Sequence, residues 1–466
     1  MTKKFYFLSL LVGLVFGMAC FTSCCDTDDV TAGGGGEEVT FYLDNEALPA
    51  GAFDLTTGTI QLTEGSELTL PFVVEPAELA SKIVLSSADP SIVAVDGLKL
   101  IAKKPGKTTI YATAGNYTMQ YDVEVQKIVD RDENGNLKIS EKNFPDAIFR
   151  TYVKDNFDTN SDDVLTDEEI AEVTSIVVNS SDIKTLEGVE FFTALQMLIC
   201  GENQLTSLDV SKNTALQGLN CHGNQLTSLD LSKNTALTRL SCSENQLTSL
   251  DVSGCTALTM LYCFTNQLTS LDLSKNTALT VLDCSTNQLT SLDLSKNTAL
   301  QQVFCNDNQL TSLDMTKNTA LEELHCHTNQ LTSLDVTKNT ALEVLYCNSN
   351  QLTSLDVSGC TALTGLYCDS NQLTSLDVTK NTALKSLNCK SNQLTSLDVT
   401  KNTALKYLYC NSNQLTSLDV SKNTALINLN CMNNQITSLD LSNNPAMDSW
   451  GLNCDENVEV TWPELA

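Results

Sequence analysis

The chain has 466 residues, with 57 acidic and 27 basic side chains and a formal net charge of −30. Phosphate backbones repel a chain with such an excess of carboxylates, so we do not expect nucleic acid as a partner. Divalent cations, basic protein surfaces and neutral glycans remain open, and a chain of this length can contain several domains.

The first residues have the features of an export signal. In "MTKKFYFLSLLVGLVFGMAC" two lysines precede an apolar run that is too short to span a bilayer, which predicts a signal peptide over residues 1–24. The next residues, "FTSCCDTDD", resemble a bacterial lipobox followed by the acidic tag of Bacteroidetes-type surface lipoproteins. The resemblance implies a lipid on Cys24, with Cys20 as the alternative, and a surface-exposed position on the outer membrane. An ordinary cleaved signal peptide is the other interpretation. The acidic and Gly-rich residues 25–36 are typical of a flexible tether.

Residues 37–127 alternate between apolar and polar side chains with a period of two, and turn signals separate the runs. This pattern predicts a small antiparallel β-sandwich. The stretch "SSADPSIVAVDGLKLIAKKPGKTTIYA" resembles the bacterial Ig-like group 2 domain of surface proteins and adhesins. The residues that carry the likeness are Ser86, Asp89, Pro90, Val95, Gly97, Gly106 and Thr109. The resemblance implies a spacer.

Residues 128–173 are expected to form a short helical, EF-hand-like cap on the repeats that follow. Within "DTNSDDVLTDEE", oxygen ligands stand at the spacing of a twelve-residue calcium loop. They are Asp158, Asn160, Asp162, Val164 through its carbonyl, and Glu169, with Thr166 or a water at the ninth place. Asp163 replaces the usual glycine at the sixth place, and Asp tolerates a left-handed backbone better than most residues. An acid-rich turn without metal is the alternative.

A second twelve-residue stretch, "DRDENGNLKISE", offers Asp130, Asp132, Asn134 and Glu141 as ligands for a further calcium ion. It has no helix before it, and "NG" alone makes a good turn. We therefore expect one calcium site, at residues 158–169, with this stretch as the weaker candidate.

From about residue 174 to 454 one phrase of 21 residues recurs. A unit such as "LQGLNCHGNQLTSLDLSKNTA" has the form L-x-x-L-x-L-x-x-N, and its second half repeats the same form. The unit resembles the nested-period bacterial class of leucine-rich repeats, with Cys in the third apolar position. The resemblance implies a solenoid of stacked coils. We expect a mainly β fold with two narrow parallel sheets around a flat core and little or no helix in the coils.

Each invariant row of the repeat has a structural interpretation. Of the 18 cysteines, 12 fall on the repeat period, from Cys200 to Cys431, which favours small buried side chains over disulfides. The asparagines from Asn203 to Asn434 should bond backbone groups where the strand turns. The aspartates from Asp209 to Asp440 should face outward, partly neutralised by nearby lysines. Two further cysteines, Cys255 and Cys360, are expected in turns as free thiols.

The units vary mainly at the residues that flank each Cys and at the two before its preceding apolar residue. Strand alternation places both flanking residues, and the residue just before that apolar one, on the outside of the first sheet. Exposed aromatic and histidine side chains at these places predict a ligand-binding face, because aromatic side chains give large contact area with few rotors. Its predicted members are Tyr262, Phe264, Phe304, His325, His327, Tyr346, Tyr367, Tyr407 and Tyr409. The alternative is that Tyr and Phe simply suit strands.

Two smaller features complete the chain. His325 and His327 form an H-x-H pair that could bind a metal, although two ligands without a third make a weak site. Residues 455–466 should form a C-terminal cap, with Trp450 and Trp462 as an apolar lid.

These features together predict a surface-anchored binding protein for adhesion or host interaction, attached to the membrane only by its lipid and monomeric. The ligand would be a protein or a glycan. The alternative is a glycan-binding accessory lipoprotein of a polysaccharide-uptake system. We do not expect an enzyme, because catalysis by carboxylates needs a pair in different environments and the aspartate row is the same in every coil.

Overall fold

The computed structural model describes residues 40–463. It divides into two compact units, residues 1–129 and 130–466. The predicted signal peptide, the tether and both candidate lipidation cysteines, Cys20 and Cys24, lie outside the described residues. Among the residues that are described, no helix is long and apolar enough to cross a membrane.

The first unit consists of short strands around one hydrophobic core. Its elements are β1 (Thr40–Leu43), η1 (Asn45–Ala47), β2 (Phe53–Asp54), β3 (Thr59–Thr63), β4 (Glu67–Thr69), β5 (Phe72–Glu75), η2 (Ala77–Lys82), β6 (Ile83–Ser87), β7 (Val93–Asp96), β8 (Lys99–Ala102), β9 (Gly106–Ala114) and β10 (Tyr117–Gln126). They form a five-stranded sheet in the order β2-β3-β10-β9-β6, a three-stranded sheet β4-β8-β7 and the pair β1-β5. All strand pairs are antiparallel except β3 with β10, which is parallel.

The period-two alternation of this segment explains its core. Along β9, Ile110, Ala112 and Ala114 are fully buried, and along β10 Val123 and Val125 are nearly so. Side chains from all three sheets join the same apolar cluster, so one face of each sheet is inside.

The second unit begins with two short acidic loops and two helices. Its first elements are β11 (Leu137–Lys138), α1 (Ala147–Phe157), β12 (Val164–Leu165) and α2 (Asp167–Glu172). The Asp146 side chain caps α1 by accepting from the amides of Ile148 and Phe149. Helix α1 is fixed to the first coil by an edge-on ring contact between Phe157 and Phe192, 5.3 Å apart.

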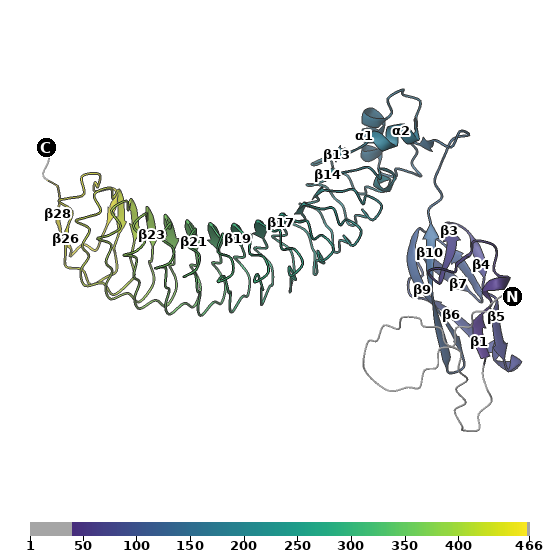
Figure 1. The fold of residues 1–466 in the computed structure, drawn as a ribbon, viewed down its shortest axis with the longest axis horizontal. Helices are drawn as coiled ribbons and strands as arrows, with labels where there is room; N and C mark the ends of the chain where they lie inside the picture. Colours follow the sequence, from purple (N-terminus) through teal and green to yellow (C-terminus); the bar gives the residue numbers. More distant parts are fainter. Residues whose placement is uncertain (1–39, 464–466) are drawn as a thin grey trace, which may run out of the picture. The chain divides into compact units, whose positions relative to one another are not determined.

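The coils that follow build one parallel sheet of 14 strands, which Figure 1 shows in chain order from teal to yellow. Each coil contributes one strand, of three residues except for the two-residue β27, and η3 (Val189–Phe191) lies between the first two strands. The strands are β13 (Ser175–Val177), β14 (Met197–Ile199), β15 (Gly218–Asn220), β16 (Arg239–Ser241), β17 (Met260–Tyr262), β18 (Val281–Asp283), β19 (Gln302–Phe304), β20 (Glu323–His325), β21 (Val344–Tyr346), β22 (Gly365–Tyr367), β23 (Ser386–Asn388), β24 (Tyr407–Tyr409), β25 (Asn428–Asn430) and, at the end, β27 (Leu452–Asn453).

The predicted inward rows are buried. Neighbouring strands pair in register, so that Leu345 lies beside Leu366 and Tyr346 beside Tyr367. The 12 cysteines of the repeat period are at most 1% exposed, and all are free thiols. From β14 onward the described coils contain no helix, as the repeat predicts.

The second parallel sheet was predicted wrongly for most of the coils. The "LTSLD" segments form only isolated bridges, between Asp314, Asp335 and Asp356, until β26 (Ser438–Asp440) pairs with β28 (Glu459–Thr461). In each coil the aspartate accepts the amide of the residue two places on, at 2.9 Å for Asp335 and Thr337. Asp440 of β26 makes the same bond, with the Ser442 amide, so this local bond does not decide whether the segment pairs.

The predicted apolar lid of tryptophans is also wrong. Trp450 is 91% exposed and Trp462 is 38% exposed. The last coil is closed instead by strand pairing, in which the amide of Leu441 donates to the carbonyl of Thr461.

Candidate ligand-binding face

The outer face of the parallel sheet carries a continuous stack of rings on four neighbouring strands. Phe304, His325, Tyr346 and Tyr367 are the last residues of β19 to β22, so in-register pairing places their rings in one column. Successive ring centroids are 4.7, 4.3 and 4.2 Å apart, and the two tyrosine rings are parallel within 2°. Aromatic pairs at such spacing attract beyond their area of contact.

A shallow groove of about 540 Å³ runs beside this stack. It is lined by His325, His327, Tyr346, Asn348, Tyr367, Asp369, Asn388 and Lys390. His327, Asn348, Asp369 and Lys390 come from the column that follows the cysteines, which faces the same side as the rings, and Asn388 stands in the column of the rings. We call this surface, together with Phe304 and Glu323, the ring groove.

Hydrogen bonds fix the polar side chains of the ring groove. Glu323 Oε1 lies 2.8 Å from His325 Nε2, and its other oxygen accepts from Gln302 at 3.2 Å. Asp369, only 7% exposed, accepts from Asn388 Nδ2 at 2.9 Å and lies 4.0 Å from Lys390 Nζ. A side chain held in this way presents a defined shape to a ligand.

Burial alters the acid–base properties of the ring groove. It raises the pKa of Tyr346 to about 12, with help from the neighbouring Tyr367. It also raises the pKa of Asp369, against the opposing effect of Lys390, and lowers the pKa of His327. All three shifts favour the neutral forms, as expected where water is displaced.

The structure brings together five of the nine predicted face residues and separates the other four. In the part of the chain that the structure describes, no ring contact joins Tyr262 and Phe264, or Tyr407 and Tyr409, to the stack. For Tyr262 and Tyr409 the reason lies in their own column, where Asp283 interrupts the rings on β18 and Asn388 on β23. Phe264 and Tyr407 stand in other columns. Tyr407 is 41% exposed.

The binding face predicted from the sequence does not include the polar half of the ring groove. Asn348, Asp369, Asn388 and Lys390 all stand in the two variable columns beside the cysteines, so the variation between units was the signal. The emphasis on aromatic side chains left them out.

The histidine pair has no third metal ligand beside it among the described residues. Each histidine has one nitrogen facing a carboxylate, His325 at 2.8 Å from Glu323 and His327 at 4.0 Å from Asp307. Across residues 40–463, no three His, Cys, Asp or Glu side chains converge as metal ligands.

The two acidic loops before the coils are related to each other in a way that the sequence did not reveal. Strands β11 and β12 pair antiparallel, with Leu137 opposite Leu165, and these are the eighth residues of the two twelve-residue stretches. The sixth residues, Gly135 and Asp163, have φ values of 89° and 67°. Both loops therefore turn through a left-handed residue at the place where a calcium loop needs one.

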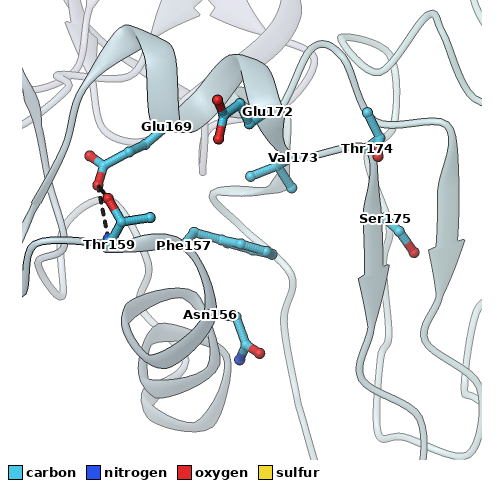
Figure 2. Close-up of a pocket in the computed structure, with 8 residues that line it drawn as sticks. All are labelled: Asn156, Phe157, Thr159, Glu169, Glu172, Val173, Thr174 and Ser175. Carbon is cyan, nitrogen blue, oxygen red and sulfur yellow. Dashed lines mark hydrogen bonds between the residues drawn. The ribbon is translucent and has the colours of Figure 1, made fainter.

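The side chains of the second loop bond within the loop. Glu169 accepts from the amide and hydroxyl of Thr159, at 2.9 and 2.6 Å, next to a pocket of about 280 Å³ that is lined by Asn156, Phe157, Glu172 and Ser175 among others (Figure 2). The Asp158 carboxylate accepts from the amides of Asp162 and Asp163. The donor types fit calcium, while their oxygens here receive hydrogen bonds.

Comparison with known proteins supports the repeat and its class. The family described as leucine-rich repeats (two copies) matches residues 235–276 and 340–381. Internalin J of Listeria monocytogenes is 42% identical over 70 residues, which is 15% of this chain and only 8% of that protein.

Solved structures extend the likeness to more than two thirds of the chain. The functional domain of InlJ from Listeria monocytogenes, which includes a cysteine ladder, is 36% identical, with 72% of this chain and 82% of that chain covered and a TM-score of 0.55. An internalin (inlF) from the same organism is 25% identical, with 71% and 94% covered and a TM-score of 0.59.

Proposed function

Since the chain belongs to the internalin-like family of bacterial leucine-rich-repeat proteins, we propose that it is a surface-anchored binding protein that holds its ligand in the ring groove. The role in adhesion or host interaction is part of the proposal. The observation that carries it is the coincidence of the variable columns with the aromatic stack and the groove on one face of a constant scaffold.

Energetic considerations support this face over the others. The "NQLTSLD" segments are nearly identical in all coils and offer no unique place for a ligand. The ring groove combines rings with few rotors and polar groups that are already fixed, which lowers the entropic cost of binding.

The test is a pull-down with the full chain against host matrix proteins and, in parallel, a glycan array. Changing Tyr346 and Tyr367 together to Ser should reduce capture of the ligand at least tenfold with the melting temperature nearly unchanged. Tyr117→Ser, which alters an exposed tyrosine of the first unit, is the matched control. Equal capture by both variants would remove the ring groove from the proposal.

The alternative, a glycan-binding accessory lipoprotein, is favoured less by the rings themselves. Sugar rings stack on free aromatic faces, whereas Tyr346 has His325 on one face and Tyr367 on the other, which leaves Tyr367 with one open face, toward Asn388. Binding on the glycan array without any protein capture would reverse this preference.

The remaining parts of the chain have supporting roles in the proposal. Lipidation at Cys24 would anchor the chain in the outer membrane, and residues 37–127, as a bacterial Ig-like domain, would serve as a spacer. The sheets and the shared core of the first unit are consistent with that domain type.

We also propose that the EF-hand-like cap binds calcium at residues 158–169. Asp158, Asn160, Asp162, Glu169 and the Val164 carbonyl would hold the ion, which would supply charge neutralisation and rigidity to the cap. The left-handed sixth residues and the paired eighth residues of the two loops support this. The loop at Asp130, Asp132, Asn134 and Glu141 is the weaker second candidate, because it follows strand β10, whereas helix α1 leads into the loop at residues 158–169.

Calorimetric titration of the full chain with calcium chloride tests the cap. We expect binding at one site, a higher melting temperature, and loss of both when Asp158 and Asp162 are changed to Asn. The matched control changes Asp132 to Asn in the other loop. Absence of heat and of any thermal shift with the unchanged chain would exclude the site.

A further inference from the structure

The residues that precede the cysteines form the column that contains the ring stack, here called the ring column. One position in this column has no ring, although the positions on both sides of it have one. The column runs Phe304, His325, Tyr346, Tyr367, Asn388 and Tyr409 on six consecutive strands. Asn388 on β23 therefore lies between Tyr367 on β22 and Tyr409 on β24. We call the space above Asn388 the ring gap.

The Asn388 side chain does not fill this place as a ring would. Its Nδ2 donates to Asp369 Oδ1 at 2.9 Å, and its Oδ1 accepts from the Lys390 amide at 3.4 Å. Both bonds draw the short side chain toward the column that follows the cysteines. The residues on this side of Tyr367, namely Asp369, Asn388 and Lys390, line the end of the groove.

The size of the ring gap follows from the stack itself. Tyr346 lies between His325 and Tyr367, whose strands are two places apart, with ring centroids at 4.3 and 4.2 Å. Tyr367 and Tyr409 are also two strands apart, which is about 9.6 Å at ordinary strand spacing. A planar group of a partner can therefore lie between them as Tyr346 lies between its neighbours.

Charge decides which planar group is favoured. Asp369 borders the ring gap, is 7% exposed and, among the described residues, is paired at 4.0 Å with Lys390. Burial raises the pKa of this carboxyl, although Lys390 and His327 act to lower it. The chain as a whole carries a charge of −30, which attracts cations to it.

We propose that the ring gap is an arginine-binding site, in which the guanidinium of a protein partner is inserted between Tyr367 and Tyr409 and pairs with Asp369. A guanidinium is planar, stacks on aromatic faces and bonds carboxylates with two parallel N–H groups, which no other cationic side chain does. The inference rests on the proposed function of the ring groove and narrows its ligand to a protein segment with an exposed arginine.

The experiment is a calorimetric titration of the full chain at physiological salt with three synthetic peptides. They share a Gly-Ser backbone and carry three copies of Arg, of Lys or of Tyr. The Arg peptide should bind at least tenfold more tightly than the Lys and Tyr peptides. Asn388→Tyr, which fills the ring gap, should weaken Arg-peptide binding at least tenfold, and Asp369→Asn at least fivefold.

Asn430→Tyr is the matched control, since Asn430 follows Tyr409 in the same column but lies outside the gap. It should bind the Arg peptide like the unchanged chain, and thermal melting should show all variants folded. Equal binding of the Arg and Lys peptides, or unchanged binding by Asn388→Tyr, would overturn the inference in favour of general attraction to an acidic surface. Tighter binding of the Tyr peptide would also overturn the inference, because it would mean that the ring gap takes a neutral aromatic side chain instead of arginine.

The two proposals fail in different ways. If Asn388→Tyr still captures the ligand found by the pull-down while the Tyr346 and Tyr367 double variant does not, the ring groove stands and the ring gap is rejected. If neither variant affects capture, both are rejected.

Discussion

Two columns of buried asparagine in the coils differ in how many of their polar atoms are bonded. In the first column, Asn308 donates to three carbonyls, of Cys284, Cys305 and Asn306, and its Oδ1 accepts from the Leu289 amide at 2.9 Å. In the second column, Asn297 donates to two carbonyls, while its Oδ1 has no partner among the described residues. The predicted role of the first column, bonding backbone groups at the turn, is confirmed.

The second column also explains Cys255 and Cys360, which occupy it in two coils. Both are fully buried, and Cys360 Sγ lies 3.2 Å from the Val336 carbonyl, where an asparagine amide would donate. They are free thiols as predicted, but they are not at the surface of a turn. A cysteine is tolerated here because the asparagine it replaces left one polar atom unbonded.

We therefore predict that replacing asparagine by cysteine lowers the free energy of unfolding more in the first column than in the second. Asn308→Cys leaves the Leu289 amide without its acceptor, and a buried group without a partner costs about 1–3 kcal/mol. Asn297→Cys leaves both of its carbonyls with a backbone donor, the amides of Asn276 and Leu279. Denaturant unfolding should show a larger decrease in the free energy of unfolding for Asn308→Cys than for Asn297→Cys. Equal decreases would mean that the asparagines stabilise the coils only through the volume that they fill.

At the scale of single elements, the coil shows why the repeat period of the side chains is easier to predict than the pairing of the strands. The leucine and cysteine spacing determines which side chains are inside, and those rows are buried as expected. That spacing does not determine whether the second half of a coil forms a sheet. Asp335 and Asp440 both accept the amide two places on, yet only the segment of Asp440 pairs as a strand, with β28.

The ring column illustrates the same limit. The 21-residue period already places the four rings of β19 to β22 on consecutive coils, but their contacts at 4.2 to 4.7 Å come only from the structure. The buried carboxylate of Asp369 could not be foreseen, because its hydrogen bond to Asn388 comes from the next coil.

The short helix α2 allows a prediction about acid stability. Thr166 and Glu169 form a reciprocal capping box, and Glu169 also accepts from Thr159. Burial acts to raise the pKa of Glu169, but these hydrogen bonds outweigh it and lower the pKa to about 2. Because the folded pKa is below the ordinary value of 4.5, the stabilisation is present above pH 4.5 and is lost as the pH falls toward about 2.

Glu169→Gln should consequently reduce the melting temperature of the cap at neutral pH and flatten its decline below pH 4.5. The measurement is thermal unfolding between pH 7 and pH 2 in the presence of a chelator, so that bound calcium does not contribute. Glu172→Gln, one turn along the same helix, is the control. A variant that declines with acid as steeply as the unchanged chain would show that Glu169 is not the titrating group.

At the scale of the whole chain, a constant scaffold and a variable face separate stability from binding. Each coil contributes the same leucine, cysteine and asparagine rows to a shared interior, and stability in such arrays comes from each coil and its contacts with its neighbours. Substitutions in the outward columns leave those contacts intact. This arrangement lets the ring groove change without loss of the fold.

The shared interior predicts how the thiols react. Of the 15 described cysteines, 14 are buried and Cys454 alone is partly exposed. Burial raises the pKa of the ladder thiols, for example that of Cys326 to about 12, and a thiol in this state is a poor nucleophile. With a bulky maleimide at neutral pH, mass spectrometry should therefore find Cys454 labelled, and the 14 others labelled only after denaturant is added. Cys454→Ser should remove the native signal from the described residues. Rapid labelling of several ladder thiols in the native chain would contradict a common interior, and the ring groove built on its outer face would lose its foundation.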